Sequence, residues 1–189
     1  MTIQESIARL TTWMLAHGAP LLAENLAAGA SAQAIATLEK ELGFPLAAEL
    51  KELWSLHDGQ KNEQNGFVGS LDLLGTRRAI DERIGIMRSL EFLREDASTW
   101  DEAGVTRHEA LSDQWVPIAQ RDADSLVVNM ETGRVFTCSK DSPPLKFVAA
   151  SIGAWLAEYA ERVGDGKYTV EEGFGDYFLE DTEGRHWLI

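Results

Sequence analysis

The sequence predicts an α+β fold, in which N-terminal helices pack on a mostly antiparallel β-sheet and a C-terminal helix closes the domain. Apolar residues recur every three or four positions through the first half of the chain, which is typical of helices. Apolar and β-branched runs separated by turn residues follow between residues 115 and 148 and indicate strands. A helical period returns after Ser151. Helices first and strands later favour this class over an alternating parallel sheet.

The expected helices have recognisable ends. Thr2 and Glu5 fit a capping box at the first helix, and Ser31 is a good N-cap for a later one. Pro45 is expected to open the next helix, and Thr76 to cap another. The helices are predicted at residues 2–16, 20–26, 31–43, 45–57 and 76–94, with a last one after Ser151.

The strand region contains one clear hairpin. The turn at residues 131–133, Glu-Thr-Gly, separates two β-rich runs and predicts an antiparallel pair. A further short strand is expected at residues 66–70 or 71–74. The main strands are predicted at residues 115–119, 125–130, 134–138 and 145–148.

The chain divides by composition into one domain and an extension. A length of 189 residues suits a single domain, which we place at residues 1–163. Residues 164–189 are glycine-rich and acidic, and we expect them to pack on the same domain. From Glu158 to Glu183 there are nine acidic and two basic residues, a net charge of −7. Residues 187–189, Trp-Leu-Ile, are expected to return to the body as a strand or an anchored end.

Charge restricts the partners of this chain. Seventeen basic and 31 acidic residues give a formal net charge of −14. Nucleic-acid binders have the opposite sign, because neutralising phosphates supplies much of their affinity. An anionic membrane surface would also repel the chain, whereas a basic protein would be attracted and steered. The alternative is that acidity serves only solubility.

Targeting and redox signals indicate a cytoplasmic protein. No apolar run reaches the roughly 20 residues of a membrane span, and the N-terminus lacks a secretory leader pattern. The one cysteine, Cys138, allows no internal disulfide.

Catalytic and cofactor motifs are absent from the sequence. The histidines at 17, 57, 108 and 186 are isolated and form no HExxH. There is no GxSxG elbow, and no glycine-rich phosphate loop follows a strand. The sequence therefore predicts neither an enzyme nor a bound cofactor or metal.

One pair of residues keeps an enzymatic alternative open. His57-Asp58 resembles the metal dyad of HD-type phosphohydrolases, which would make the chain a metal-dependent hydrolase. The position of the pair at a helix end, directly before Gly59, favours a helix-dipole and turn explanation.

Other acidic and aromatic residues are candidates for contact with a partner. Asp122 and Asp124 are two positions apart, which permits a cation site but is more typical of a polar turn before a strand. Trp100 lies in a polar stretch, where an exposed tryptophan would suit an interface, although burial is commoner.

The order of these pieces resembles the SUKH superfamily. This superfamily groups yeast cell-wall assembly regulators with bacterial toxin-immunity proteins. The strand 115–119, the hairpin 124–135 and the helix 151–159 resemble conserved parts of its fold, although Asn129 stands where many members have aspartate. The signature helix pair is represented by Ser31, Ile35, Leu38, Glu39, Leu42, Gly43, Pro45, Leu46, Leu50, Leu53, Trp54 and residues 57–60.

The resemblance, which covers residues 30–160, implies a function by binding rather than catalysis. Bacterial members commonly neutralise toxins, prominently nucleases, whose basic surface an acidic inhibitor can occupy. We therefore expect an immunity-type protein with a basic protein partner. The alternative is a regulatory or scaffold protein related to the cell-wall regulators, and a neighbouring toxin gene would favour immunity. The oligomeric state is left open. The candidate partner-binding residues are Asp58, Gln60, Trp100, Asp122 and Asp124.

Overall fold

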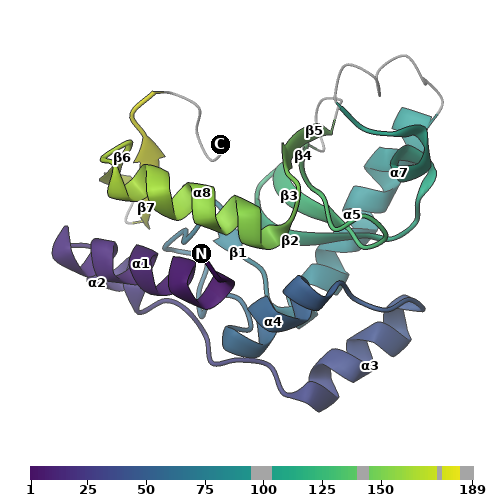
Figure 1. The fold of residues 1–189 in the computed structure, drawn as a ribbon, viewed down its shortest axis with the longest axis horizontal. Helices are drawn as coiled ribbons and strands as arrows, with labels where there is room; N and C mark the ends of the chain where they lie inside the picture. Colours follow the sequence, from purple (N-terminus) through teal and green to yellow (C-terminus); the bar gives the residue numbers. More distant parts are fainter. Residues whose placement is uncertain (95–103, 140–144, 174–175, 184–189) are drawn as a thin grey trace.

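The computed structural model confirms the α+β class and describes residues 1–94, 104–139, 145–173 and 176–183. Five antiparallel strands form the main sheet in the order β1-β2-β3-β4-β5 (Figure 1). Two further strands, β6 and β7, form a separate hairpin. The strands are β1 (Asp72–Leu73), β2 (Trp115–Arg121), β3 (Asp124–Asn129), β4 (Val135–Ser139), β5 (Lys146–Ala149), β6 (Tyr168–Gly173) and β7 (Asp176–Asp181).

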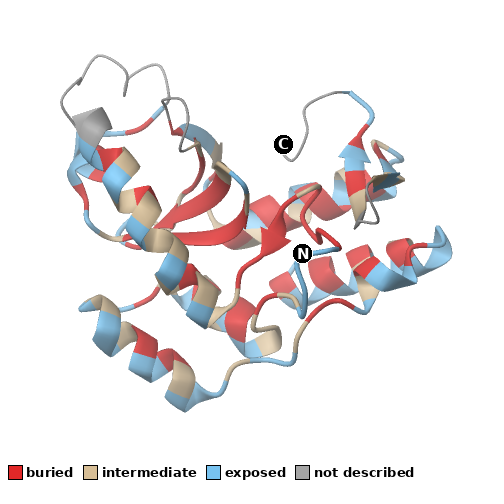
Figure 2. Cartoon of the chain, turned by 180° about the vertical axis from the view of Figure 1, so that it is seen from behind, coloured by how far each residue is buried: buried red, intermediate tan, exposed pale blue. Residues whose placement is uncertain are grey.

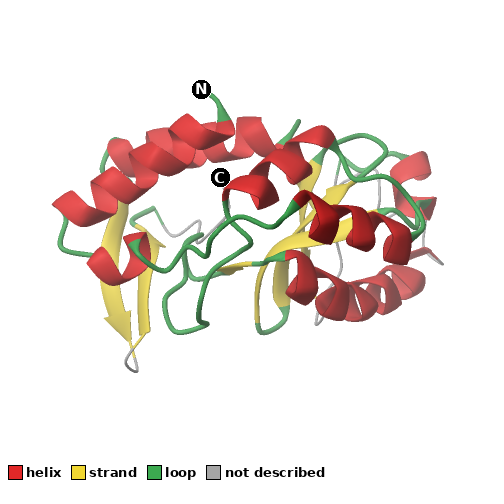
Figure 3. Cartoon of the chain, turned by 90° about the horizontal axis from the view of Figure 1, so that it is seen from below, coloured by secondary structure: helices red, strands yellow, loops and turns green. Residues whose placement is uncertain are grey.

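Most helices precede the sheet in the chain, and α8 follows it. Figure 3 shows helices on both sides of the sheet. In the described part of the chain, no helix is long and apolar enough to cross a membrane. The helices are α1 (Ile3–Ala16), α2 (Pro20–Ala23), α3 (Ala32–Leu42), α4 (Ala48–Leu56), α5 (Thr76–Arg94), α7 (Arg107–Leu111) and α8 (Ile152–Gly164).

The two faces of the sheet belong to different apolar cores. Figure 2 shows buried residues along the strands of the sheet and on the helices around it. On one face, Ile118 and Leu126 share the larger core with residues of α1, α4 and α8. On the other face, Trp115, Val127 and Phe136 pack with residues of α5 and α7 in a smaller core. This alternation follows from the period of two along a strand, which sends successive side chains to opposite faces.

The predicted helix starts are confirmed at α1 and α3. Thr2 and Glu5 form a complete capping box, and the Ser31 hydroxyl accepts the backbone N–H of Ala34 at 3.1 Å. The helix predicted to begin at Pro45 begins three residues later, at Ala48. Glu39 explains the delay, because its carboxylate accepts the backbone N–H of Leu46 at 2.8 Å and holds the connection outside the helix.

The strand predictions at 115–119, 125–130, 134–138 and 145–148 are confirmed to within two residues at each end. The short strand proves to be β1, at the second of the two places expected. The polar stretch before β2 contains α7, which was not predicted. A capping box between Thr106 and Glu109 begins this helix.

The hairpin β6–β7 was not predicted either. It lies at the end of α8 away from the main sheet (Figure 1). Tyr168 and Leu179 enter the larger core from it, and backbone hydrogen bonds join Tyr177 to the loop at residues 64–66. The division of the chain at residue 163 stays a prediction. Residues 187–189 lie outside the described residues.

Candidate functional site

The Asp58 carboxylate lies at the beginning of α5. It accepts the backbone N–H of Thr76 at 2.6 Å and lies 3.3 Å from the Thr76 hydroxyl oxygen. A free N–H at the start of a helix needs such an acceptor. Asp58, and not Thr76 as predicted, therefore caps α5 from a distant part of the chain.

His57 and Asp58 do not turn toward a common point. His57 Nδ1 lies 2.9 Å from the carbonyl oxygen of Ala27, and its ring lines a different hollow beside α1. Asp58 faces Thr76 instead. In the described part of the chain, no three His, Cys, Asp or Glu residues are grouped to hold a metal.

Gln60 joins the loop after α4 to strand β1. Its Oε1 accepts the backbone N–H of Leu73 at 2.9 Å, and its Nε2 donates to Asp72 Oδ1 at 2.9 Å. A second Nε2 contact reaches the Asn62 carbonyl oxygen at 2.7 Å. Gln60 therefore orients Asp72 as well as holding the loop.

Asp72 is the central charge of this region. Only 4% of its side chain is exposed, with Arg121 at 2.8 Å from Oδ1 and Arg78 at 3.4 Å from Oδ2. Burial raises the pKa of the Asp72 carboxyl, although both guanidinium groups oppose the rise. The buried carboxylate fixes both arginines at one end of the sheet.

A polar hollow of about 600 Å³ opens beside this carboxylate. It lies between the beginning of α5 and the β1–β2 end of the sheet, on the face covered by α5. Four carboxylates and two guanidinium groups leave it with a net charge of −2. The lining residues are Glu63, Asp72, Arg78, Glu82, Gln120, Arg121 and Asp122.

Two predicted residues lie in the β2–β3 turn beside this hollow. Asp122 lines the hollow and has φ 54°, a left-handed conformation that aspartate tolerates better than most residues. Asp124 begins β3, pairs with Arg121 in the sheet and is half-buried. The turn explanation for this pair is consistent with the geometry. Trp100 lies outside the described residues.

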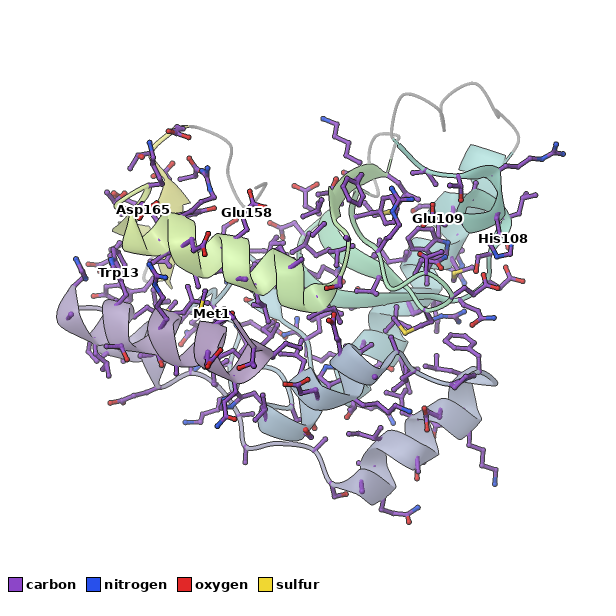
Figure 4. The ribbon with its side chains drawn as sticks, in the orientation of Figure 1. Met1, Trp13, His108, Glu109, Glu158 and Asp165 are labelled. Carbon is purple, nitrogen blue, oxygen red and sulfur yellow. The ribbon has the colours of Figure 1, made fainter. Side chains whose placement is uncertain are left out.

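A second buried charge lies at the far end of the smaller core. Glu109 is completely buried and accepts from Arg134 at 2.6 Å and from Thr132 at 2.8 Å. Burial raises the pKa of Glu109, but hydrogen bonds from Thr106 and Thr132 and the charge of Arg134 outweigh it, so the pKa is lowered. Figure 4 shows Glu109 and His108 at one end of the molecule and Asp165 at the other. The contacts of Glu109 with Arg134 and Thr132 hold α7 against the sheet.

Comparison with known families decides the relationship of the chain. The family model described as the SMI1/KNR4 family (SUKH-1) matches residues 29–158, which is more than half of the chain. The chain belongs to the SMI1/KNR4 family. The resemblance to the SUKH superfamily is thereby confirmed, over almost the same residues as predicted. No curated protein matches the chain.

The SMI1/KNR4 match includes the polar hollow, most of whose residues were not among the predicted site residues. Asp72 and Gln120 were hidden because each lies in an apolar strand. A signal was present, since a charge between Leu71 and Leu73 and an amide after Ala119 interrupt buried runs. Polar residues inside a buried strand are uncommon and are paired or functional.

Proposed function

We propose that this SMI1/KNR4 protein is a non-catalytic, cytoplasmic protein-binding domain of the immunity type, which binds and neutralises a basic protein toxin. The observation that carries the proposal is the net-negative hollow at the β1–β2 end of the sheet, in a chain of net charge −14. Acidic surface attracts a basic partner and raises its association rate.

The surface around the hollow is the proposed contact region. Asp122 lines it, Asp124 follows in the same turn, and Gln60 holds Asp72 at its floor. Asp58 adds support through the beginning of α5. Loop and turn residues on a rigid sheet are well suited to binding, because the scaffold fixes their positions.

The absence of a catalytic role is part of the proposal. The His57-Asp58 pair is held by backbone groups and the start of α5, which supports a structural explanation for both residues. The polar groups around Asp72 form ion pairs and hydrogen bonds with one another, as a structural network does.

Toxicity rescue tests the immunity role directly. Each gene adjacent to the gene for this chain is expressed in a sensitive host, with and without the full-length chain. We expect one neighbouring product to arrest growth and the chain to restore it. A toxic neighbour whose effect the chain leaves unchanged, or no toxic neighbour at all, would contradict immunity and favour regulation of a partner in the same cell.

A further inference from the structure

A row of polar side chains crosses the sheet at the edge of the smaller core. Asp72 of β1 is the register partner of Gln120 of β2, and Gln120 is the register partner of Ser125 of β3. Register partners place their side chains on the same face of a sheet. All three residues are buried, so the row continues the polar hollow beneath α5 into the protein.

Gln120 has an unsatisfied acceptor in this row. The residue is 5% exposed, and its Nε2 lies 3.3 Å from the carbonyl oxygen of Asp122. That contact fixes the orientation of the amide, because a carbonyl oxygen only accepts. Gln120 Oε1 is buried and has no hydrogen-bond partner among the described residues. Buried acceptors are normally paired, and leaving one unpaired is energetically unfavourable.

Ser125 repeats the pattern one strand further. Its Oγ is also buried without a hydrogen-bond partner in the described part of the chain. Two unpaired oxygens therefore belong to register partners, one of which lines the hollow. The Ser125 hydroxyl can donate or accept, whereas the Gln120 amide oxygen only accepts and therefore calls for a ligand that donates hydrogen bonds.

The charges of the hollow select a cationic donor. Four carboxylates and two guanidinium groups line the hollow, and Arg78 is shared between Asp72 and Glu63, so negative charge is in excess there. A guanidinium group is planar, always charged and carries five N–H donors. It can therefore reach an amide oxygen and a carboxylate at the same time, whereas an ammonium group is a compact and strongly hydrated point charge.

We infer that the hollow takes one arginine side chain of the partner, whose guanidinium group donates to Gln120 Oε1 and to the Asp122 carboxylate. This inference rests on the proposed function and adds the group that is recognised. The arginine supplies the donor that Gln120 lacks. An anion is disfavoured, since it would face the carboxylates.

A small arginine compound tests the site without the partner. The full-length ¹⁵N-labelled chain is titrated with N-acetyl-arginine amide, with N-acetyl-lysine amide and with sodium phosphate, and followed by NMR. We expect saturable shifts at the Gln120 side-chain amide and at residues 120–122 with the arginine compound. The lysine compound is expected to bind at least about fivefold more weakly, because it offers fewer donors in a fixed plane.

Three variants locate the binding. Gln120→Met removes the acceptor at similar volume and is expected to weaken arginine binding by about tenfold. Asp122→Asn keeps a residue that tolerates the left-handed conformation and is expected to weaken it by about threefold. Asp122→Asn also keeps the test valid if Gln120→Met does not fold. The control Glu41→Gln removes an equal charge from an exposed position on α3 and should leave binding unchanged.

Several outcomes would overturn the inference. Equal binding of the arginine and lysine compounds would indicate attraction by charge alone. Phosphate shifts at residues 120–122 would indicate an anion site, and no shift with any compound would mean that Gln120 Oε1 is satisfied by water only. The two proposals fail separately: a captured toxin without arginine binding removes this inference alone, and arginine binding with no toxin rescue removes the immunity role alone.

Discussion

The Asp72 carboxylate and the Arg121 guanidinium group lie 2.8 Å apart beneath the polar hollow, with only 4% of the Asp72 side chain exposed. Asp72 also pairs with Arg78 and accepts a hydrogen bond from Gln60, so three residues from separate segments depend on one buried charge. A buried carboxylate is tolerated only when its partners remain. This dependence leads to a pH-sensitive prediction.

Arg121→Met is expected to lower the free energy of unfolding by roughly 1.5–3 kcal/mol at pH 7, because it removes a charged hydrogen-bond donor from Asp72. Burial already raises the pKa of Asp72, and losing Arg121 raises it further. The folded variant therefore takes up a proton more readily than the unfolded chain does. The difference in unfolding free energy between wild type and Arg121→Met should therefore become smaller as the pH falls from 7 toward 4.

Urea unfolding at a series of pH values measures this deficit. Arg77→Met is the control, since the side chain of Arg77 on α5 is 85% exposed and its loss should change stability by less than about 0.5 kcal/mol. A deficit for Arg121→Met that stays constant across the pH range would contradict the role of Asp72.

Asp58→Ala is expected to lower the free energy of unfolding by about 1–2 kcal/mol, because the backbone N–H of Thr76 loses its acceptor. Asp58→Asn keeps a side-chain oxygen and should cost less than half as much. Chemical denaturation of the two variants side by side measures the difference. Equal losses would show that the charge of Asp58, and not its capping hydrogen bond, matters.

Glu109→Gln is expected to destabilise the protein by roughly 1.5–3 kcal/mol at neutral pH, since Arg134 loses its carboxylate partner. The folded pKa of Glu109 lies below its usual 4.5, so its contribution is fully present above pH 4.5. It is lost as the pH falls from there through the lowered pKa. Unfolding free energies of wild type and variant should therefore converge below pH 4.5. If the difference in unfolding free energy between wild type and Glu109→Gln stays constant below pH 4.5, the Glu109 carboxylate does not stabilise the fold in this way.

Metal removal is expected to change nothing. The His57 ring contacts the Ala27 carbonyl oxygen, and the Asp58 carboxylate accepts the Thr76 N–H. Dialysis against a chelator should therefore leave the melting temperature within about 1 °C of its starting value. Elemental analysis of the purified chain provides the companion measurement. One metal ion per chain, lost in His57→Ala, would revive the hydrolase alternative.

Local signals in the sequence were enough for much of the fold. The Thr2–Glu5 box and the Ser31 cap depend on residues three positions apart, and the strands depend on a period of two. The start of α4 could not be predicted, because Glu39 holds the preceding connection from the previous helix. The capping of α5 by Asp58 could not be predicted for the same reason, because Asp58 and Thr76, whose backbone N–H it accepts, are 18 positions apart in the chain.

The candidate site was predicted only at its rim. Asp122 and Asp124 stood out because two acidic residues in a turn are conspicuous in sequence. The floor of the hollow depends on the register between β1 and β2, which brings together Asp72 and Gln120, residues 48 positions apart in the chain. No local pattern carries that information, so the polar row emerged only when the strands were paired.

Capture of the partner at two salt concentrations tests the central claim most directly. The tagged full-length chain, the variant Glu63→Gln/Glu82→Gln/Asp122→Asn and the control Glu41→Gln are incubated with extract of the source cell at about 0.05 M and about 0.5 M salt, and bound proteins are identified by mass spectrometry. We predict one stoichiometric basic protein, bound by wild type and control at low salt, released at high salt, and at least about tenfold depleted from the triple variant. Failure to capture a basic protein at low salt, or equal capture by all three chains at both salt concentrations, would contradict the account.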